Sequence, residues 1–271
     1  MRRKRVGALL GGVAFVLLLA VEPAAAQASA NRELIWGLNS KLIYVAVPIS
    51  ILVEAILIYT VWKFRASNQE EASPTQENRR LEITWTVATA IILLFVGFAS
   101  YQVLASPMVG GSSVENVQQQ GTAHVSKDLP GATAPTEPNA LEVEVIASKY
   151  VWTFHYPDSD VTSTNKLVVP TDRPVYLHVV SEDWLHSFHV PDLALKQDAF
   201  PGQYNTIKTE LYETGTYQLY CAEYCGVGHS QMTGTVEVRS QDGFQQWIQS
   251  QSQSGSTGGS GGSANATATP A

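Results

Sequence analysis

The sequence predicts two membrane-spanning helices followed by an all-β domain of the Greek-key sandwich or barrel type. Two long apolar stretches lie within the first 105 residues, and each matches the roughly 20 apolar residues that a helix needs to cross a bilayer. After residue 139, short segments of alternating polarity are separated by turn residues, which is typical of β-sandwiches and barrels. A chain of 271 residues, 45% hydrophobic and 15% charged, suits one such domain beside membrane segments.

Residues 1–26 are expected to form a cleavable signal peptide. The basic start Met-Arg-Arg-Lys-Arg precedes an apolar run over residues 6–21, and three alanines follow at 24–26. This order of basic, apolar and small residues is that of a secretory signal, with cleavage expected after Ala26. An uncleaved membrane anchor is the alternative.

The two spans are predicted at residues 42–61 and 83–104, within a helical hairpin over residues 27–105. Aromatic residues lie near their ends, where an interfacial belt is expected: Trp36, Trp62, Trp85 and Tyr101. The loop between the spans carries four basic residues: Lys63, Arg65, Arg79 and Arg80. Because basic loops stay in the cytoplasm, both ends of the hairpin are expected on the extracytoplasmic side.

Two carboxylates belong to this membrane region. Glu54 lies within the first span, where a charged side chain is costly and is usually functional or paired. A protonated Glu packed against a neighbouring helix is the alternative, and no role is assigned to it. Glu82 precedes the second span at the water interface, where an acidic residue that complements the helix dipole is a sufficient explanation.

The remaining chain is predicted as a linker, a β domain and a tail. Residues 106–138 are rich in Gly, Ser, Gln, Thr and Pro and predict a linker. The β domain is predicted over residues 139–250, with strands at 141–146, 150–156, 174–180, 204–211, 216–220 and 233–239 and a closing helix at 242–250. The Ser/Gly-rich residues 251–271 are expected to be disordered.

Segment 221–232 concentrates metal-binding side chains in one short loop. It contains the two cysteines of the chain, Cys221 and Cys225, together with His229 and Met232. Thiolate and thioether groups select copper over hard cations, and a Met ligand argues against a structural zinc site, so copper is the first candidate. A mononuclear blue copper site needs one thiol, so the second favours two metal ions. A disulfide between the cysteines, or two inert core thiols, is the alternative.

A further ligand is expected from His186, which lies at a strand edge in Ser181-Glu182-Asp183-Trp184-Leu185-His186-Ser187. His186, followed by Cys221-x-Glu223-x-Cys225-x-x-x-His229-x-x-Met232, resembles the copper-binding pattern of subunit II of haem-copper cytochrome c oxidases. Residues 181–187 and 196–202 also resemble this family, and the similarity covers about residues 31–250.

The resemblance implies a binuclear copper centre, CuA. Its ligands would be two bridging thiolates from Cys221 and Cys225, one imidazole each from His186 and His229, a weak thioether from Met232 and the backbone carbonyl of Glu223. The side chain of Glu223 would face a magnesium ion shared with subunit I. With the copper loop between the last two strands, the β domain would be a cupredoxin-like barrel. A closed ligand set leaves no open position for a substrate, which suits electron transfer.

The implied protein is the electron-transfer subunit of a cytochrome c oxidase in the plasma membrane of a prokaryote, with the copper domain on the extracytoplasmic side. Electrons from cytochrome c, or from another soluble donor such as a blue copper protein, would pass through CuA to haem in subunit I. Oxygen would be reduced to water there, with proton pumping, and other oxidase subunits are expected partners. By the same resemblance, Glu82 would lie at the entrance of a proton channel. A membrane-anchored copper-binding module outside an oxidase is the alternative function.

The predicted point of electron uptake departs from the family pattern. The family usually has two tryptophans one residue apart, of which the first receives the electron, whereas this chain has Tyr150 and Trp152. Trp152 is also compatible with buried packing. Gln203 stands where the family often has Arg, so contacts towards subunit I are expected to differ. Three further histidines are assigned structural or surface positions and no copper: His155, His178 and His189.

The β domain is acidic. Residues 139–250 contain six Lys or Arg and fourteen Asp or Glu, a net charge of −8. Such a domain would attract a basic donor such as cytochrome c, with salt-sensitive association, and no nucleic-acid partner is expected. A generally soluble extracytoplasmic surface, or adaptation to a salty environment, would give the same acidic excess.

Overall fold

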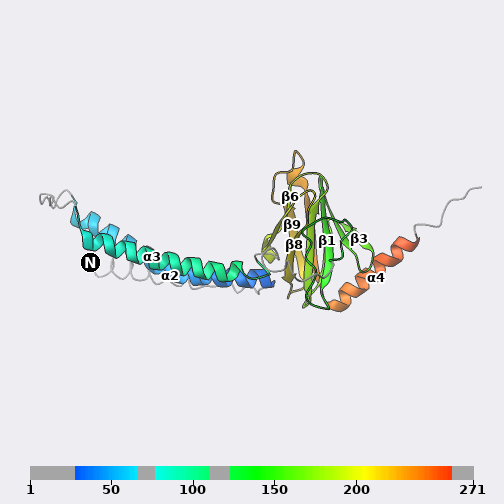
Figure 1. The fold of residues 1–271 in the computed structure, drawn as a ribbon, viewed down its shortest axis with the longest axis horizontal. Helices are drawn as coiled ribbons and strands as arrows, with labels where there is room; N and C mark the ends of the chain where they lie inside the picture. The colour runs from blue at the N-terminus through cyan, green and yellow to red at the C-terminus, as the bar shows by residue number, and fades with distance from the viewer. Residues whose placement is uncertain (1–27, 66–76, 110–122, 258–271) are drawn as a thin grey trace, which may run out of the picture.

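A computed structural model describes residues 28–65, 77–109 and 123–257. The predicted signal peptide lies outside the described residues, as do residues 110–122 of the linker and 258–271 of the tail. Figure 1 shows a long helical hairpin that projects from one side of a β domain. The predicted fold class is confirmed, since two apolar helices precede an all-β domain.

The hairpin consists of α2 (Ala30–Lys63) and α3 (Arg79–Leu104). Both are long and apolar enough to cross a membrane, with mean hydropathies of 2.3 and 2.1 over their most apolar windows. Helix α2 begins well before residue 42, the predicted start of the span. The Ser29 hydroxyl accepts a hydrogen bond from the Arg32 N–H at 3.1 Å and so caps the helix. It also donates to the Leu193 carbonyl, which ties the start of α2 to the β domain.

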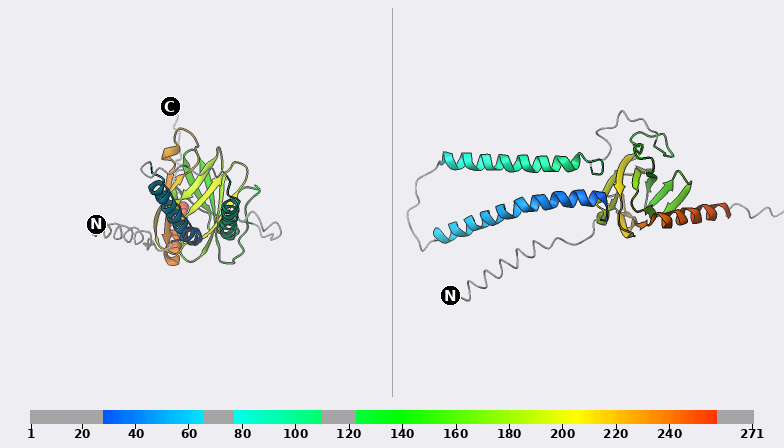
Figure 2. Two further views of the ribbon diagram at one scale, coloured as in Figure 1. Left: turned by 90° about the vertical axis from the view of Figure 1, so that its left-hand side faces the viewer. Right: turned by 90° about the horizontal axis from the view of Figure 1, so that it is seen from below.

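Ten strands among the described residues form two five-stranded sheets. The first sheet has the order β3-β2-β1-β5-β8, with bounds β1 (Leu141–Ser148), β2 (Val151–Tyr156), β3 (Val161–Thr164), β5 (Pro174–Ser181) and β8 (Asn205–Glu210). The second has the order β4-β10-β9-β6-β7, with bounds β4 (Lys166–Pro170), β6 (His186–Val190), β7 (Leu195–Ala199), β9 (Gly215–Cys221) and β10 (Thr233–Arg239). Strands β1 and β5 are parallel, as are β4 and β10, and the other pairs are antiparallel. The views in Figure 2 show the two helices leaving the same end of this domain.

The core lies between the two sheets. In β2, alternate residues Trp152, Phe154 and Tyr156 are buried, as the period of a strand requires. The Tyr156 hydroxyl links the sheets, because it donates to the Val168 carbonyl and accepts from the Val168 N–H, both at 2.8 Å. The aromatic residues of β2 therefore fix how the second sheet, which carries the cysteine loop, lies against the first.

Part of the predicted linker covers the outer face of the first sheet. Glu142 and Glu144 alternate with apolar residues in β1, yet both are buried. The N–H of His124 donates to Glu142 at 2.9 Å, and the Ser126 hydroxyl donates to Glu144 at 2.8 Å. His178 of β5 lies 3.0 Å from Glu142. Residues 123–138 therefore form a layer of the domain instead of a free connection.

Helix α4 (Gln241–Thr257) closes the domain and continues into residues predicted to be disordered from 251 onward. Phe244 and Trp247 pack against Tyr156, with ring centroids 6.2 and 5.2 Å apart. These contacts anchor the first turns, and a helix that is already nucleated extends at low cost.

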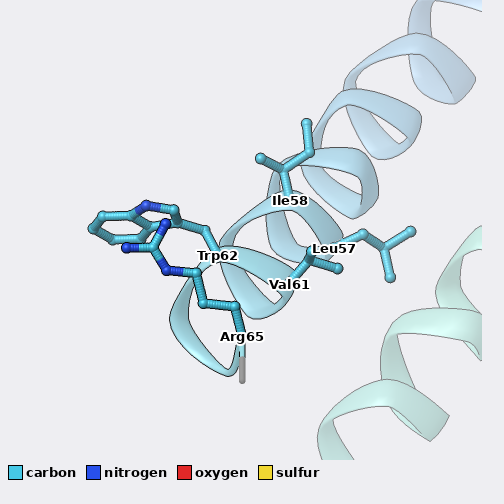
Figure 3. Close-up of a pocket in the computed structure, with 5 residues that line it drawn as sticks. All are labelled: Leu57, Ile58, Val61, Trp62 and Arg65. Atoms are coloured by element: carbon cyan, nitrogen blue, oxygen red, sulfur yellow. The ribbon is translucent and has the colours of Figure 1, made fainter. Parts of the chain in front are cut away.

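A shallow hollow lies at the C-terminal end of α2. Its lining is mostly apolar and comprises Leu57, Ile58, Val61, Trp62 and Arg65. Figure 3 shows the Arg65 side chain alongside the Trp62 ring. The hollow belongs to the end of a membrane helix and shares no residue with the cysteine loop.

Candidate metal centre

The cysteine loop joins β9 to β10 and is held at its base by both neighbouring strands. The Cys221 N–H donates to the Met232 carbonyl at 3.0 Å, which closes the loop on itself. The Ala222 N–H donates to the Ser187 carbonyl at 3.0 Å, which ties the loop to β6. Because Cys221 is opposite Phe188 in the β6–β9 pairing, His186 at the start of β6 lies beside the same loop.

Two glycines let the loop pass under an aromatic ring. Gly226 has a φ of 125°, which non-glycine residues rarely adopt. A Cβ atom at Gly226 would lie 2.6 Å from the Tyr150 hydroxyl, and one at Gly228 would lie 2.4 Å from the Tyr150 ring. The predicted uptake residue Tyr150 therefore packs directly on the cysteine loop.

The two thiols face each other without a bond between them. The Sγ atoms of Cys221 and Cys225 are 3.9 Å apart, far more than the about 2.05 Å of a disulfide, and both cysteines are buried and free. The Met232 sulfur, also buried, lies 3.9 Å from the Cys225 sulfur. The Glu223 carbonyl oxygen lies 3.1 Å from the Cys221 sulfur.

Each sulfur has an imidazole of its own. His186 Nδ1 lies 3.8 Å from the Cys221 sulfur, and His229 Nδ1 lies 3.6 Å from the Cys225 sulfur. One ligand atom from each of His186, Cys221 and Cys225 lies within 4.8 Å of the others, a group able to hold a metal ion. His229 contacts the Cys225 sulfur and is not part of this group. The structure thus brings together all six sequence-predicted copper ligands.

These separations fit a soft metal. In a four-coordinate site with metal–sulfur bonds of about 2.3 Å and metal–nitrogen bonds of about 2.0 Å, neighbouring ligand atoms lie roughly 3.5–3.8 Å apart. The observed sulfur–nitrogen and sulfur–sulfur distances of 3.6, 3.8 and 3.9 Å match this spacing. Thiolate, thioether and imidazole donors together select copper. The residues present therefore fit a copper centre.

The surroundings give the two thiols different acidities. Burial opposes ionisation of Cys221, but hydrogen bonds from His186 and from the backbone outweigh it and lower the pKa of this thiol to about 6. Burial and the neighbouring charge on Cys221 raise the pKa of the Cys225 thiol to about 11. One thiolate is therefore ready to bind a cation at neutral pH, and the bound cation would favour ionisation of the second thiol.

Asp183 fixes the orientation of His186, a role that the sequence pattern did not predict. Its Oδ1 atom lies 2.8 Å from His186 Nε2, which leaves Nδ1 to face the sulfur. The same carboxylate accepts hydrogen bonds from the backbone N–H groups of Lys149 and Trp184, at 2.9 and 2.6 Å. A carboxylate on the far nitrogen of a metal-binding histidine is a recurrent feature of metal sites. The signal in the sequence is an Asp three residues before the histidine.

The other predicted site residues lie as follows. The Glu223 side chain is partly exposed, and its carboxylate lies 3.6 Å from Lys196 Nζ. Trp152 is fully buried, its ring lies edge-on to His186 at 6.4 Å, and its Nε1 has no hydrogen-bond partner among the described residues. Glu82 lies in the first turn of α3, and Glu54 lies exposed on α2. Gln203 is exposed.

The three remaining histidines contact other partners. His178 lies 3.0 Å from Glu142, and His155 lies 3.4 Å from Glu144. His189 packs edge-on to Tyr220, with ring centroids 4.9 Å apart. None of the three belongs to the thiol group found among the described residues.

Comparison with known proteins decides the family. Residues 20–103 match the model of the cytochrome c oxidase subunit II transmembrane domain, and residues 159–239 match that of the cytochrome c oxidase subunit II periplasmic domain. The chain belongs to the cytochrome c oxidase subunit II family. It is therefore a membrane protein of an oxidoreductase complex with an electron-transfer role, and the copper that this family implies has a matching donor set here.

Individual relatives are similar over most of the chain. Cytochrome c oxidase subunit 2 of Synechocystis sp. is 29% identical over 246 residues, which are 82% of this chain and 73% of the relative. That of Thermostichus vulcanus is 29% identical over 250 residues, 82% of this chain and 76% of the relative. The periplasmic domain of cytochrome oxidase subunit II from Bradyrhizobium japonicum is a similar solved structure, with 24% identity, a TM-score of 0.41 and coverage of 42% of this chain and 94% of that one.

Proposed function

We propose that this subunit II binds two copper ions between its cysteine thiols and accepts electrons there from a soluble donor for delivery to haem in subunit I. The observation that carries the proposal is the pair of buried, unbonded sulfurs 3.9 Å apart, each flanked by its own imidazole. A single metal ion would need one thiol and one imidazole of this kind, whereas two thiols that each contact a different imidazole suit two metal ions.

The six residues would have the following roles in copper binding. Cys221 and Cys225 would hold both copper ions, His186 and His229 would each hold one, and the Met232 sulfur and the Glu223 carbonyl would be the remaining donors. When bound, the two copper ions would supply a one-electron acceptor. Burial of both thiols, His186 and Met232 excludes water, and Asp183 holds His186 in place. Such a closed site favours electron transfer over bond-making chemistry.

Copper content and electron paramagnetic resonance of the purified full chain test this proposal. Two coppers per chain that share one unpaired electron are expected. Cys225→Ser should lose that signal and reduce the copper content to one or none, while Ser187→Ala, which alters a neighbouring hydroxyl, should keep both. A wild-type chain that holds a single copper, or zinc, would overturn the binuclear assignment.

The Glu223 side chain is proposed to bind a magnesium ion shared with subunit I. Its backbone carbonyl faces Cys221, while its side chain is 41% exposed and its carboxylate lies 3.6 Å from Lys196 Nζ. In the assembled oxidase, manganese substituted for magnesium should give a resonance signal that Glu223→Gln alters and Glu213→Gln does not. An unchanged signal in Glu223→Gln would exclude this side chain as a ligand.

The donor is proposed to be cytochrome c or another basic carrier. The charge of −8 over residues 139–250 supports this choice, because opposite charges accelerate encounter. The rate of electron uptake from a basic cytochrome c should fall steeply as ionic strength rises, while uptake from an acidic blue copper protein should not. The reverse order would exclude a basic donor.

The topology follows from the basic loop between the spans. We propose a plasma-membrane location in a prokaryote, with residues 63–80 in the cytoplasm and the β domain outside. In intact cells, a membrane-impermeant thiol reagent should label a cysteine introduced at exposed Tyr212 and not one introduced at Arg79. Labelling only at Arg79 would reverse the orientation.

Glu82 is proposed to lie at the entrance of a proton channel into subunit I. Its position in the first turn of α3, with an exposed side chain at the cytoplasmic end of the span, supports this role. Glu82→Gln should slow turnover of the oxidase complex without changing copper content, and Glu77→Gln, just outside the helix, should not. Normal turnover in Glu82→Gln would remove this assignment.

A further inference from the structure

We propose that Trp184 is the surface residue through which a soluble, basic electron-carrier protein delivers its electron to the thiol centre. This inference rests on the proposed function and names the contact point that the function requires. Neither of the predicted uptake residues suits that contact well: Trp152 is fully buried, and Tyr150 is wedged against Gly226 and Gly228.

Trp184 combines exposure with a short connection to a copper ligand. Trp184 is 57% exposed, although tryptophans usually bury most of their surface. Its backbone N–H donates to Asp183 Oδ1, and that same oxygen lies 2.8 Å from His186 Nε2. Two hydrogen bonds through one carboxylate therefore link the exposed residue to the imidazole beside Cys221.

Lys149 holds the exposed ring in place. Its Nζ lies 4.4 Å from the centroid of the Trp184 ring, a cation–π contact. Its backbone N–H donates to the other oxygen of Asp183 at 2.9 Å. Trp184, Lys149 and His186 are thus all held by the Asp183 carboxylate or by one another. Because the Trp184 ring is already ordered, a partner that binds it loses little free energy to ordering this side chain.

A second exposed aromatic, Tyr224, lies beside His229, whereas Trp184 connects to His186, so Tyr224 suits another contact. Tyr224 is 73% exposed, and the centroid of its ring lies 5.8 Å from that of His229. Its neighbour Val227 is 97% exposed, which makes this part of the loop apolar. Permanent subunit interfaces are more apolar, whereas transient interfaces place a polar rim around their aromatic anchors. Tyr224 and Val227 therefore fit a permanent partner subunit.

The surroundings of Trp184 fit a transient partner. Glu182 and Asp183 precede it in the chain, and the Glu182–Lys127 pair at 3.0 Å is exposed. The charge of −8 over residues 139–250 favours a basic partner. In the transfer, a ferrous donor haem becomes ferric and the copper centre gains that one electron. No bond forms or breaks, and Trp184 provides the contact without being consumed.

The test uses the complete oxidase complex with two reductants and one binding measurement. Trp184→Ala should weaken binding of basic ferric cytochrome c, and slow electron uptake from ferrous cytochrome c, by about tenfold or more, as truncation of an aromatic anchor does. Reduction by hexaammineruthenium(II), which needs no docking, should stay within about twofold of wild type. Trp184→Phe should restore most of the binding, and Tyr212→Ala, an exposed aromatic elsewhere on the domain, should match wild type.

The outcomes separate this inference from the proposed function. If wild type accepts electrons from both reductants and Trp184→Ala behaves like wild type, the inference is wrong and the function stands. The inference is also wrong if Tyr224→Ala, and not Trp184→Ala, weakens cytochrome c binding. If wild type holds no copper and accepts electrons from neither reductant, the proposed function itself fails. An unchanged resonance signal in Trp184→Ala shows that the centre has kept its structure.

Discussion

Replacing Asp183 by Asn should weaken copper binding, because the carboxylate orients His186. Three N–H groups converge on its two oxygens: His186 Nε2 at 2.8 Å, the Lys149 backbone at 2.9 Å and the Trp184 backbone at 2.6 Å. An Asn side chain offers one acceptor oxygen, so its amide must face at least one of these donors. The variant thus loses an acceptor and replaces it with a repulsive contact.

The magnitude follows from the hydrogen bond that is lost. A hydrogen bond to a charged group contributes about 1.5–3 kcal/mol, which corresponds to roughly 10–150-fold in an equilibrium constant. Loss of the carboxylate partner of a metal-binding histidine typically costs about 10–100-fold in metal affinity. Copper binding to Asp183→Asn should therefore be about 10–100-fold weaker than to wild type.

The assay is a competition titration of the full chain against a chelator of known copper affinity, followed by thiolate-to-copper absorbance. Asp158→Asn is the matched control, because Asp158 also pairs with a histidine, His124, at 3.0 Å and lies outside the thiol site. The control should bind copper like wild type. If Asp183→Asn binds within about twofold of wild type, the carboxylate does not hold His186 in its binding orientation.

Three further outcomes are expected. Tyr156→Phe should destabilise the domain by about 2–4 kcal/mol in denaturant unfolding, because it strips the partner from one buried N–H and one buried carbonyl of β4; a loss below about 1 kcal/mol would contradict this. Burial would raise the pKa of Glu142, but hydrogen bonds from His178 and from the backbone outweigh burial and hold this pKa below the ordinary 4.5. The ionised Glu142 carboxylate therefore contributes its full stabilisation above pH 4.5, and this stabilisation is lost as the pH falls through the lowered pKa. Glu142→Gln should therefore flatten the fall in Tm on acidification, and a parallel curve would refute the assignment. Gly228→Ala should distort the copper absorbance through its clash with Tyr150, and adding Tyr150→Ala should restore the spectrum if steric overlap is the cause.

The ligands could be predicted from the sequence because most of them are local. Cys221, Cys225, His229 and Met232 share one loop, and their donor chemistry alone indicates a soft metal. The strands nearest that loop were predictable for a similar reason: β10 spans the predicted residues 233–239. The positions of the ligands along the sequence could not predict the distance between His186 and Cys221, because that distance depends on the pairing of β6 with β9.

Features that depend on long-range contacts escaped prediction. The alternation in β1 indicates that Glu142 and Glu144 face solvent, but residues 123–138 cover that face and bury both. Strand β7 contains Lys, Gln and Asp and lies at the edge of its sheet beside β6, so it carries little apolar pattern. Asp183 looks like a surface acid until the fold places it against His186.

The scaffold sets the separations between the ligand atoms. The β9–β10 pairing and the Cys221–Met232 hydrogen bond fix both ends of the loop, and the Ala222–Ser187 hydrogen bond fixes its side. Each side-chain ligand atom therefore lies 3.6–3.9 Å from its neighbouring sulfur. A centre positioned by sheet pairing changes little in geometry when its charge changes, which is what rapid one-electron transfer requires.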